Sequence, residues 1–297
     1  MSGRRAKGDA GRTTEPTAWG PIARFEPLLP APSVGRVMTG SVGVVVPAYR
    51  PNTGNLAAYV AALDAELTAA TIRIELDVPR PGVVGALADA PATVNAVPRR
   101  RGKGRAITEG FEALSTDVYC FADADGSTPA GSVAAVIAPV CAGEADLVVG
   151  SRRHPAARVT SHQTLVRRRL GDGFAWLARR LIEPALSDYQ CGAKAIGAAA
   201  WEAVRGHLRE PGFAWDVELV ATAAALGRRV REVPVEWHDH PDSTVATAGT
   251  TLALARGLVR ARHRAKCLHD DPLHRAIAAH GERRPALVGP DSKADGR

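Results

Sequence analysis

Two aspartates that directly follow an apolar run constrain the fold and chemistry of this chain more than any other feature. The run Val118 to Ala122 has the length of a buried strand, and Asp123-Ala-Asp125 ends it before a turn that contains Gly126. Ligands of open α/β sheets bind at the carboxyl edge of the strands. Two carboxylates at that edge suit Mg²⁺ or Mn²⁺ held together with a diphosphate. The alternative is a solvated aspartate pair that caps the following helix.

The composition excludes several classes of protein. The chain has 297 residues, 45% of them hydrophobic, which is enough for one large or two small domains with a sizeable core. No apolar stretch approaches the roughly 20 residues that span a bilayer, and the N-terminus lacks the apolar segment of a signal peptide. The four cysteines have neither Cys-x-x-Cys nor zinc-ligand spacing, which favours a reducing cytosol over a disulfide framework.

The net charge of +7 favours an anionic partner. Charge alone does not choose among a nucleotide diphosphate, a lipid phosphate, an acidic membrane surface and nucleic acid.

Apolar runs of strand length alternate with helical patterns through residues 41–245. We expect strands at 42–46, 72–76, 94–97, 118–122, 146–150, 195–196 and 231–237. This alternation predicts an α/β fold: a single domain with a Rossmann-like, mostly parallel central sheet and helices on both faces. The first strand is expected to end in a nucleotide-binding loop at 47–51, and residues 154–164 are expected to form a mobile loop.

The remaining segments flank this domain. Residues 1–40 lack a sustained period and predict a disordered N-terminal arm. Residues 246–268 predict an amphipathic basic helix, which fits either peripheral contact with an anionic membrane surface or ordinary packing with a solvated face. Residues 269–297 are polar, interrupted by Gly and Pro, and are expected to be a disordered tail.

Two basic segments lie at predicted helix starts. Residues 98–105, Pro-Arg-Arg-Arg-Gly-Lys-Gly-Arg, predict a phosphate cradle or, alternatively, a basic surface turn or nucleic-acid patch. Arg167, Arg168 and Arg169 lie in the first turns of a predicted helix at 165–186, where they oppose the helix dipole. This opposition costs free energy, which the binding of a phosphate to the arginines would offset. His238-Asp-His240 lacks a third ligand at metal-binding spacing, so we interpret it as a solvated turn.

Eight blocks, taken in order, resemble the family 2 inverting glycosyltransferases of GT-A fold. The blocks are Val44-Val-Val-Pro-Ala-Tyr49, Asp77, Arg101-Gly-Lys-Gly104, Phe121 to Pro129, Val148 to Arg152, Asp188 to Lys194, Phe213 to Leu219 and Glu232 to Trp237. Within the family, residues 42–245 look most like the dolichyl-phosphate glucosyltransferases and their archaeal and bacterial polyprenyl-phosphate relatives.

The resemblance implies transfer of a hexose, with inversion, from a nucleotide-sugar to a polyprenyl or dolichyl phosphate. The donor it favours is UDP-glucose, and the product would be a lipid-linked sugar for glycan assembly or protein glycosylation. The implied cofactor is a divalent metal, Mg²⁺ or Mn²⁺. The implied location is the cytoplasmic face of a membrane, with peripheral contact and no nucleic-acid partner. An acceptor phosphate, with a second pKa of about 6, is largely anionic at neutral pH, so no general base is required.

The resemblance also carries roles to individual residues. The metal ligands are Asp123 and Asp125, and the catalytic residues are Asp125, Arg152 and Arg167. The nucleotide-sugar contacts are Pro47, Ala48, Tyr49, Asp77, Lys103 and Asp123. The acceptor phosphate is assigned to Arg152, Arg167 and Arg168.

Two departures from the family pattern bear on the nucleotide. Arg50-Pro51 replaces the usual Asn-Glu, and Asp77-Val-Pro-Arg80 replaces the usual Asp-Asp-Gly-Ser. The Gln-Cys-Gly of residues 190–192 favours UDP-glucose over GDP-mannose. The alternatives are a GDP-mannose-dependent mannosyltransferase, a GT-A transferase with a non-lipid acceptor and a base such as Asp216, and a non-catalytic basic protein that binds lipid or nucleic acid.

Overall fold

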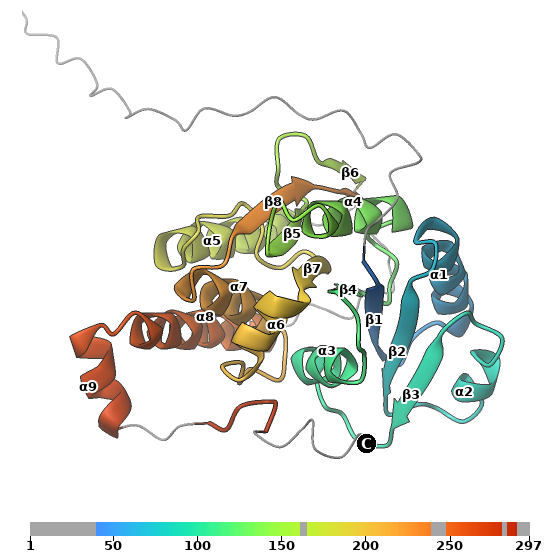
Figure 1. The fold of residues 1–297 in the computed structure, drawn as a ribbon, viewed down its shortest axis with the longest axis horizontal. Helices are drawn as coiled ribbons and strands as arrows, with labels where there is room; N and C mark the ends of the chain where they lie inside the picture. The colour runs from blue at the N-terminus through green and yellow to red at the C-terminus, as the bar shows by residue number, and fades with distance from the viewer. Residues whose placement is uncertain (1–39, 161–164, 239–247, 281–283, 290–297) are drawn as a thin grey trace, which may run out of the picture. The chain divides into compact units, whose positions relative to one another are not determined.

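A seven-stranded sheet forms the centre of the protein. The computed structural model describes residues 40–160, 165–238, 248–280 and 284–289, and its main sheet has the order β3-β2-β1-β4-β7-β5-β8 (Figure 1). Its strands are β1 (Val42–Tyr49), β2 (Thr71–Asp77), β3 (Thr93–Val97), β4 (Val118–Ala122), β5 (Leu147–Ser151), β7 (Ala193–Gly197) and β8 (Val230–Pro234). Neighbouring strands are parallel, except that β7 runs antiparallel to both β4 and β5. The predicted mostly parallel sheet is confirmed.

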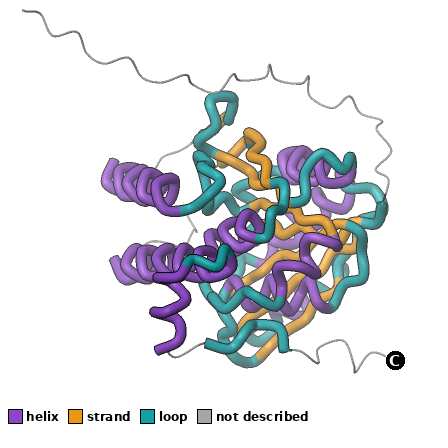
Figure 2. Tube along the Cα trace, turned by 60° about the vertical axis from the view of Figure 1, so that its left-hand side comes forward, coloured by secondary structure: helices purple, strands orange, loops and turns teal. Residues whose placement is uncertain are grey.

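Helices cover both faces of this sheet, as the alternation predicted (Figures 1 and 2). Side chains of a strand alternate between faces, so Val44 and Val46 belong to a hydrophobic cluster with α1 and α4, whereas Val45 belongs to a second cluster with α3, α5, α6, α7 and α8. The helices are α1 (Thr53–Glu66), α2 (Val83–Ala86), α3 (Lys103–Glu112), α4 (Ala130–Cys141), α5 (Leu165–Leu181), α6 (Ala198–Arg205), α7 (Trp215–Ala225), α8 (Ala248–Leu268) and α9 (Pro272–His280).

The first strand is longer than its apolar run predicts. β1 continues through Pro47, Ala48 and Tyr49, which pair with Glu75 to Asp77 of β2, so the predicted loop at 47–51 is wrong for these three residues. The pairing of β1 with β4 stops at Val45. Beyond that point β1 is locally an edge strand, where a proline without an N–H is tolerated.

A second sheet corrects two further expectations. β6 (Arg158–Thr160) pairs in parallel with β9 (Glu236–His238). The loop predicted for 154–164 therefore contains a strand, and the strand predicted for 231–237 divides between the two sheets. Buried Val235 stands at the division, where its N–H donates to Ser151 O and its carbonyl accepts from Arg158 N.

The basic helix packs against the domain. A Cβ at Gly257 of α8 would lie 2.2 Å from the Ala214 Cβ, and Leu258 is fully buried. Among the predicted basic residues, Arg260 and Arg264 donate to Glu210. Two arginines of the basic face are therefore paired with a carboxylate of the domain, which favours the packing interpretation. No helix among the described residues has the length and apolarity that crossing a membrane requires.

The tail predicted for 269–297 is partly wrong. Residues Pro272–His280 form α9. Its apolar residues Leu273 and Ile277 make a helical pattern that is too short to be recognised within the polar tail. Farther on, the Leu287 N–H donates to Leu208 O at 2.8 Å, and Val288 is buried. Apart from Gly40, the arm predicted for residues 1–40 lies outside the described residues.

Candidate active site

The two aspartates lie at the carboxyl edge of the sheet, as the sequence predicts. β4 ends at Ala122, and the next N–H, of Asp123, donates to Gly192 O at 2.8 Å. Asp125 accepts a hydrogen bond from the Ser127 N–H at 3.0 Å through Oδ1. Both side chains remain partly accessible to solvent. The carboxylates are thus held by backbone geometry in an accessible position.

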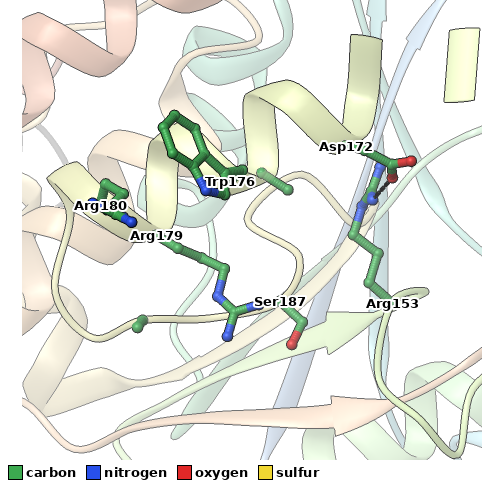
Figure 3. A pocket seen from close by; sticks show the side chains of 8 residues that line it. Arg153, Asp172, Trp176, Arg179, Arg180 and Ser187 are labelled. Carbon is green, nitrogen blue, oxygen red and sulfur yellow. Dashed lines mark hydrogen bonds and ion pairs between the residues drawn. The ribbon is translucent and has the colours of Figure 1, made fainter. Parts of the chain in front are cut away.

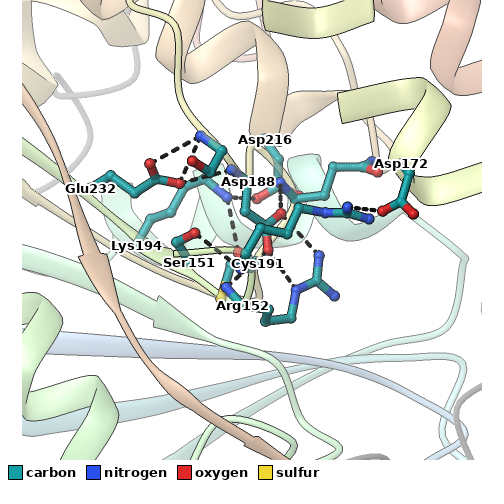
Figure 4. A network of polar contacts seen from close by, with 11 residues as sticks. Ser151, Arg152, Asp172, Asp188, Cys191, Lys194, Asp216 and Glu232 are labelled. Carbon is teal, nitrogen blue, oxygen red and sulfur yellow. Dashed lines mark hydrogen bonds and ion pairs between the residues drawn. The ribbon is translucent and has the colours of Figure 1, made fainter. Parts of the chain in front are cut away.

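Two lysines connect this edge to the start of helix α7. Lys103 Nζ lies 2.9 Å from Asp123 Oδ1 and 3.1 Å from Asp216 Oδ2. Lys194 Nζ lies 2.6 Å from the other oxygen of Asp216 (Figure 4). The ring of Phe121 lies beneath both ammonium groups, at 4.8 and 5.4 Å from its centroid. Segments around residues 103, 121, 194 and 216 thus converge on one polar cluster.

The cluster carries more negative than positive charge. Lys103 and Lys194 form ion pairs with Asp123 and Asp216, and Asp125 adds a third carboxylate, whose charge acts on Asp123. Withdrawal from solvent raises the pKa of Asp123, Lys103 opposes that shift, and Asp125 and Asp216 add to it. For Asp216, burial also acts upward, but the two lysines outweigh it and lower the pKa. Asp216 is therefore held as a carboxylate, and the excess negative charge lies at Asp123 and Asp125.

Gly192 is required for the position of Asp123. A Cβ at residue 192 would lie 2.3 Å from Asp123 Oδ2. Any other residue would displace the carboxylate, because nonbonded atoms do not approach so closely. The geometry of the site therefore requires a glycine at position 192, within the Gln-Cys-Gly sequence.

Arg152 is held by Asp188 in a two-point pair. Its Nε lies 2.6 Å from Asp188 Oδ2 and its Nη2 lies 3.0 Å from Oδ1. Burial would raise the pKa of Asp188, but Arg152 outweighs it and lowers that pKa to about 2. Glu232 of β8 fixes the loop by accepting from the N–H groups of Ser187 and Asp188 (Figure 4). The guanidinium is thus oriented before any ligand binds.

The predicted phosphate cradle is partly wrong. Arg101 is buried, with its guanidinium bonded to Glu75, Asp77 and Glu109. The N–H groups of Arg101 and Gly102 both donate to Asp77 Oδ2, so they are not directed at a phosphate. A buried guanidinium needs carboxylate partners, and β2 supplies two of them. Asp77 thus orders the start of α3, and its contact with a nucleotide stays a prediction.

The other predicted nucleotide contacts lie at the end of β1. The guanidinium of Arg100 lies 4.0 Å from the Tyr49 ring centroid, and that of Arg50 lies at 5.2 Å. Pro47 and Tyr49 are partly exposed, and Ala48 is buried. Tyr49 therefore presents a cation-flanked ring near the edge where the aspartates lie.

Some site residues were not found from the sequence, and others cannot be placed. Arg167 and Arg168 belong to the first turns of α5, but their side chains lie outside the described residues, as do Asp239 and His240. Lys194 and Asp188 had no assigned role. A charged residue inside the apolar strand Ala193–Gly197 was the available signal for Lys194.

Part of the chain is similar to known glycosyltransferase sequences. The family described as "Glycosyl transferase family 2" matches residues 84–185. Glycosyltransferase AglD of Haloferax volcanii is 32% identical over 163 residues, which cover 54% of this chain and 26% of that protein. Dolichyl-phosphate beta-glucosyltransferase of Saccharomyces cerevisiae is 28% identical over 172 residues, covering 54% of this chain and 52% of that protein. The chain thus spans about half, or less, of the length of these relatives.

Comparison with solved structures agrees on the fold. Glucosyl-3-phosphoglycerate synthase from Mycobacterium tuberculosis, in complex with Mn²⁺, UDP and phosphoglyceric acid, has a TM-score of 0.55 at 17% identity, over 77% of this chain and 78% of that one. Mannosyl-3-phosphoglycerate synthase from Rubrobacter xylanophilus has a TM-score of 0.54 at 16% identity, over 77% and 75% of the two chains. With the mostly parallel sheet, these comparisons show the GT-A fold, and residues 84–185 within it match glycosyl transferase family 2.

Proposed function

We propose that this protein transfers glucose from UDP-glucose, with inversion, to the phosphate of a polyprenyl or dolichyl lipid. The observation that carries the proposal is the Asp123/Asp125 pair at the end of β4, joined through Lys103 to Asp216. The match of more than half of this chain to dolichyl-phosphate beta-glucosyltransferases supports the choice of sugar and acceptor. The product would be a lipid-linked sugar for glycan assembly.

The residues at the strand edge fit a divalent cation. Asp123 and Asp125 supply hard oxygen donors, and the cluster around them has one more negative than positive group. Within the described part of the chain, no group of three or more His, Cys, Asp or Glu side chains could hold a metal ion. Two carboxylates suffice for Mg²⁺ or Mn²⁺ when the phosphates of a substrate complete the shell. When bound, the ion would stabilise charge on the departing diphosphate.

The state of Asp216 favours a phosphate acceptor. A sugar hydroxyl needs a base to take its proton, and a good base has a pKa near the working pH. Asp216 is 2% exposed, contacts two lysines and has a lowered pKa, which makes it a weak base. A phosphate monoester needs no base, because it is already largely ionised at neutral pH. This contrast favours the lipid-phosphate acceptor over the non-lipid acceptor that would use Asp216.

Arg152 is the described residue best placed to meet an incoming phosphate near the aspartates. Asp188 holds Nε and Nη2, and the side chain stays 27% exposed. Arginine binds phosphate with directed N–H groups. We propose that Arg152 contacts the acceptor, together with Arg167 and Arg168, and that Lys103 and Tyr49 contact the donor. A lipid acceptor also implies peripheral contact with the cytoplasmic face of a membrane.

The test measures transfer of radiolabelled sugar into an organic-extractable lipid. Purified protein is incubated with a short polyprenyl phosphate, Mg²⁺ and either UDP-glucose or GDP-mannose. We expect labelled lipid from UDP-glucose and its loss in Asp125→Ala. The exposed Asp64→Asn serves as the control, because Asp64 forms no ion pair with any described residue.

Each other outcome selects an alternative. Labelled lipid from GDP-mannose alone would replace glucose with mannose. Metal-dependent nucleotide binding without labelled lipid from either donor would refute the lipid acceptor. Metal-independent, steeply salt-sensitive RNA binding without transfer would favour the non-catalytic protein.

A further inference from the structure

A cationic cavity lies along helix α5. Its volume is about 490 Å³, within the range of small-molecule sites. The described residues that line it include Arg153, Asp172, Trp176, Arg179, Arg180 and Ser187 (Figure 3). Three arginines against one aspartate leave two positive charges on these walls. We call this the α5 cavity.

The α5 cavity and the active site share two short segments. Arg153 follows Arg152, and Ser187 precedes Asp188, so the Arg152–Asp188 pair lies one residue away along both segments. Backbone contacts keep this arrangement in place, because the Arg153 N–H donates to Ser151 Oγ and Glu232 accepts from Ser187 N. The α5 cavity and the Arg152–Asp188 pair are therefore built on the same two segments of backbone.

Only one of the three arginines that line the α5 cavity forms an ion pair with a described residue. Arg153 forms an ion pair with Asp172, and the Arg180 guanidinium lies 5.2 Å from the Trp176 ring centroid. Arg179 forms no ion pair with any described residue. Both Arg179 and Arg180 lie in the last turn of α5, where the helix dipole favours cations. The dipole explains why they are tolerated there, but it does not explain a cavity or its exposed aromatic rim.

Trp176 is the unusual part of that rim. The side chain is 61% exposed, although indole is the largest apolar side chain and is highly buried on average. Exposed tryptophan beside arginine is typical of the boundary between lipid and water, where the ring meets apolar chains and the cations meet phosphate. The cavity thus combines a phosphate-binding wall with an apolar edge.

We infer that the α5 cavity is a docking site for the phosphate head of the lipid acceptor, with Arg179 on the phosphate and Trp176 against the adjoining lipid. The inference rests on the proposed function and adds residues to those expected from the family resemblance. The ligand chemistry is a phosphate monoester, mostly a dianion at neutral pH, which guanidinium groups bind through directed hydrogen bonds. Docking here would place the phosphate on the two segments that also carry the Arg152–Asp188 pair.

The test measures binding of the full-length protein to phosphatidylcholine vesicles with and without a polyprenyl phosphate, in the absence of donor. For vesicles with polyprenyl phosphate, we expect Arg179→Gln to weaken binding about tenfold. Trp176→Ala is expected to weaken it several-fold. The matched controls are Arg228→Gln, an exposed arginine outside the cavity, and Val84→Ala, an exposed apolar residue on α2. Both controls should bind within twofold of the unchanged protein, and all four variants should keep its unfolding temperature.

A second arm separates lipid from free phosphate. Calorimetric titration with glycerol phosphate, a soluble phosphate monoester, should give binding much weaker than to the lipid. Equally tight binding that Arg179→Gln abolishes would overturn the lipid as the occupant. Variants of Arg179 and Trp176 that bind lipid vesicles like the unchanged protein would overturn the inference even if transfer to lipid is observed. Binding that depends on Arg179 without any transfer would sustain the docking site and refute the proposed function.

Discussion

At the scale of single residues, the site depends on side chains whose partners come from distant parts of the chain. Asp188 is an example, because its 3% exposure would be costly for a charge without Arg152. Truncating one partner of such a pair leaves the other charge uncompensated. The free energy of unfolding should therefore decrease at low pH, where Asp188 becomes protonated and the pair is lost.

Asp188 predicts a specific dependence of stability on pH. Its pKa is lowered from 3.8 to about 2, so the pair stabilises the fold fully above pH 3.8 and loses that contribution as the pH falls toward 2. The expected loss is about 2 kcal/mol in the free energy of unfolding. Chemical denaturation of Asp188→Asn at several pH values should show a less stable protein at pH 7 whose difference from the unchanged protein narrows below pH 4. A constant difference from pH 7 to pH 2 would contradict this.

Gly192→Ala should impair sugar transfer. The added Cβ would meet the Asp123 carboxylate at 2.3 Å and shift it from its position at the strand edge. A displacement near 1 Å can cost about 100-fold in activity, so we expect a comparable loss of transfer. Gly206→Ala is the control, because a Cβ there meets nothing within 4 Å and the backbone φ is −69°. Equal activity of the two variants would show that Asp123 tolerates the shift.

At the scale of elements, local patterns located most strands and helices but not their partners. The run Val118 to Ala122 was predicted with its observed ends, since strand length and turn residues are local properties. The same local signals found Asp123, Asp125 and Lys103. These signals could not predict the contacts among Lys103, Lys194 and Asp216, because those contacts depend on how β7 and α7 pack. They also missed α9, since a short amphipathic pattern in a polar tail has little weight alone.

Helix α8 gives a test of its packing interpretation. Gly257→Leu should force α8 away from α7, because even a Cβ at that position would lie 2.2 Å from the Ala214 Cβ. Overpacking of this kind costs about 1–3 kcal/mol, measured as the free energy of unfolding. Ala253→Leu, on the exposed side of the same helix, should leave stability within about 0.5 kcal/mol. A similar stability of both variants would indicate that α8 contributes little to the core.

At the scale of the whole molecule, the positive charge is distributed unevenly between inside and outside. Two arginines of α8, Arg260 and Arg264, form ion pairs with Glu210 and Glu218, whereas Arg179 and Arg228 are exposed. The charge of +7 thus acts on surroundings mainly through the exposed residues. Attraction to an anionic surface should be long-ranged and sensitive to salt.

Binding to phosphatidylserine vesicles should therefore fall steeply as salt rises. The Debye length shrinks from about 10 Å at 0.1 M salt to about 3 Å at 1 M, which screens exposed charges. Co-sedimentation across this range should show most of the protein released at the high-salt end. Retention that does not change with salt would instead point to apolar insertion as the main contribution.

The antiparallel direction of β7 has a consequence for how such proteins can diversify. β5 ends at Ser151 and β7 begins at Ala193, so the connection between them leaves and rejoins the sheet at the same edge. That connection contains β6, α5, Arg152 and Asp188, whereas Asp123 and Asp125 lie outside it. Because both ends of this segment are anchored side by side, its exposed parts can change in length without moving the two strands apart. The fold thereby places Arg152, the proposed acceptor contact, on a segment apart from Asp123 and Asp125, the proposed metal ligands. Chimeras that exchange the exposed parts of this segment and keep Gly192 would test whether the acceptor can change while the metal ligands stay in place.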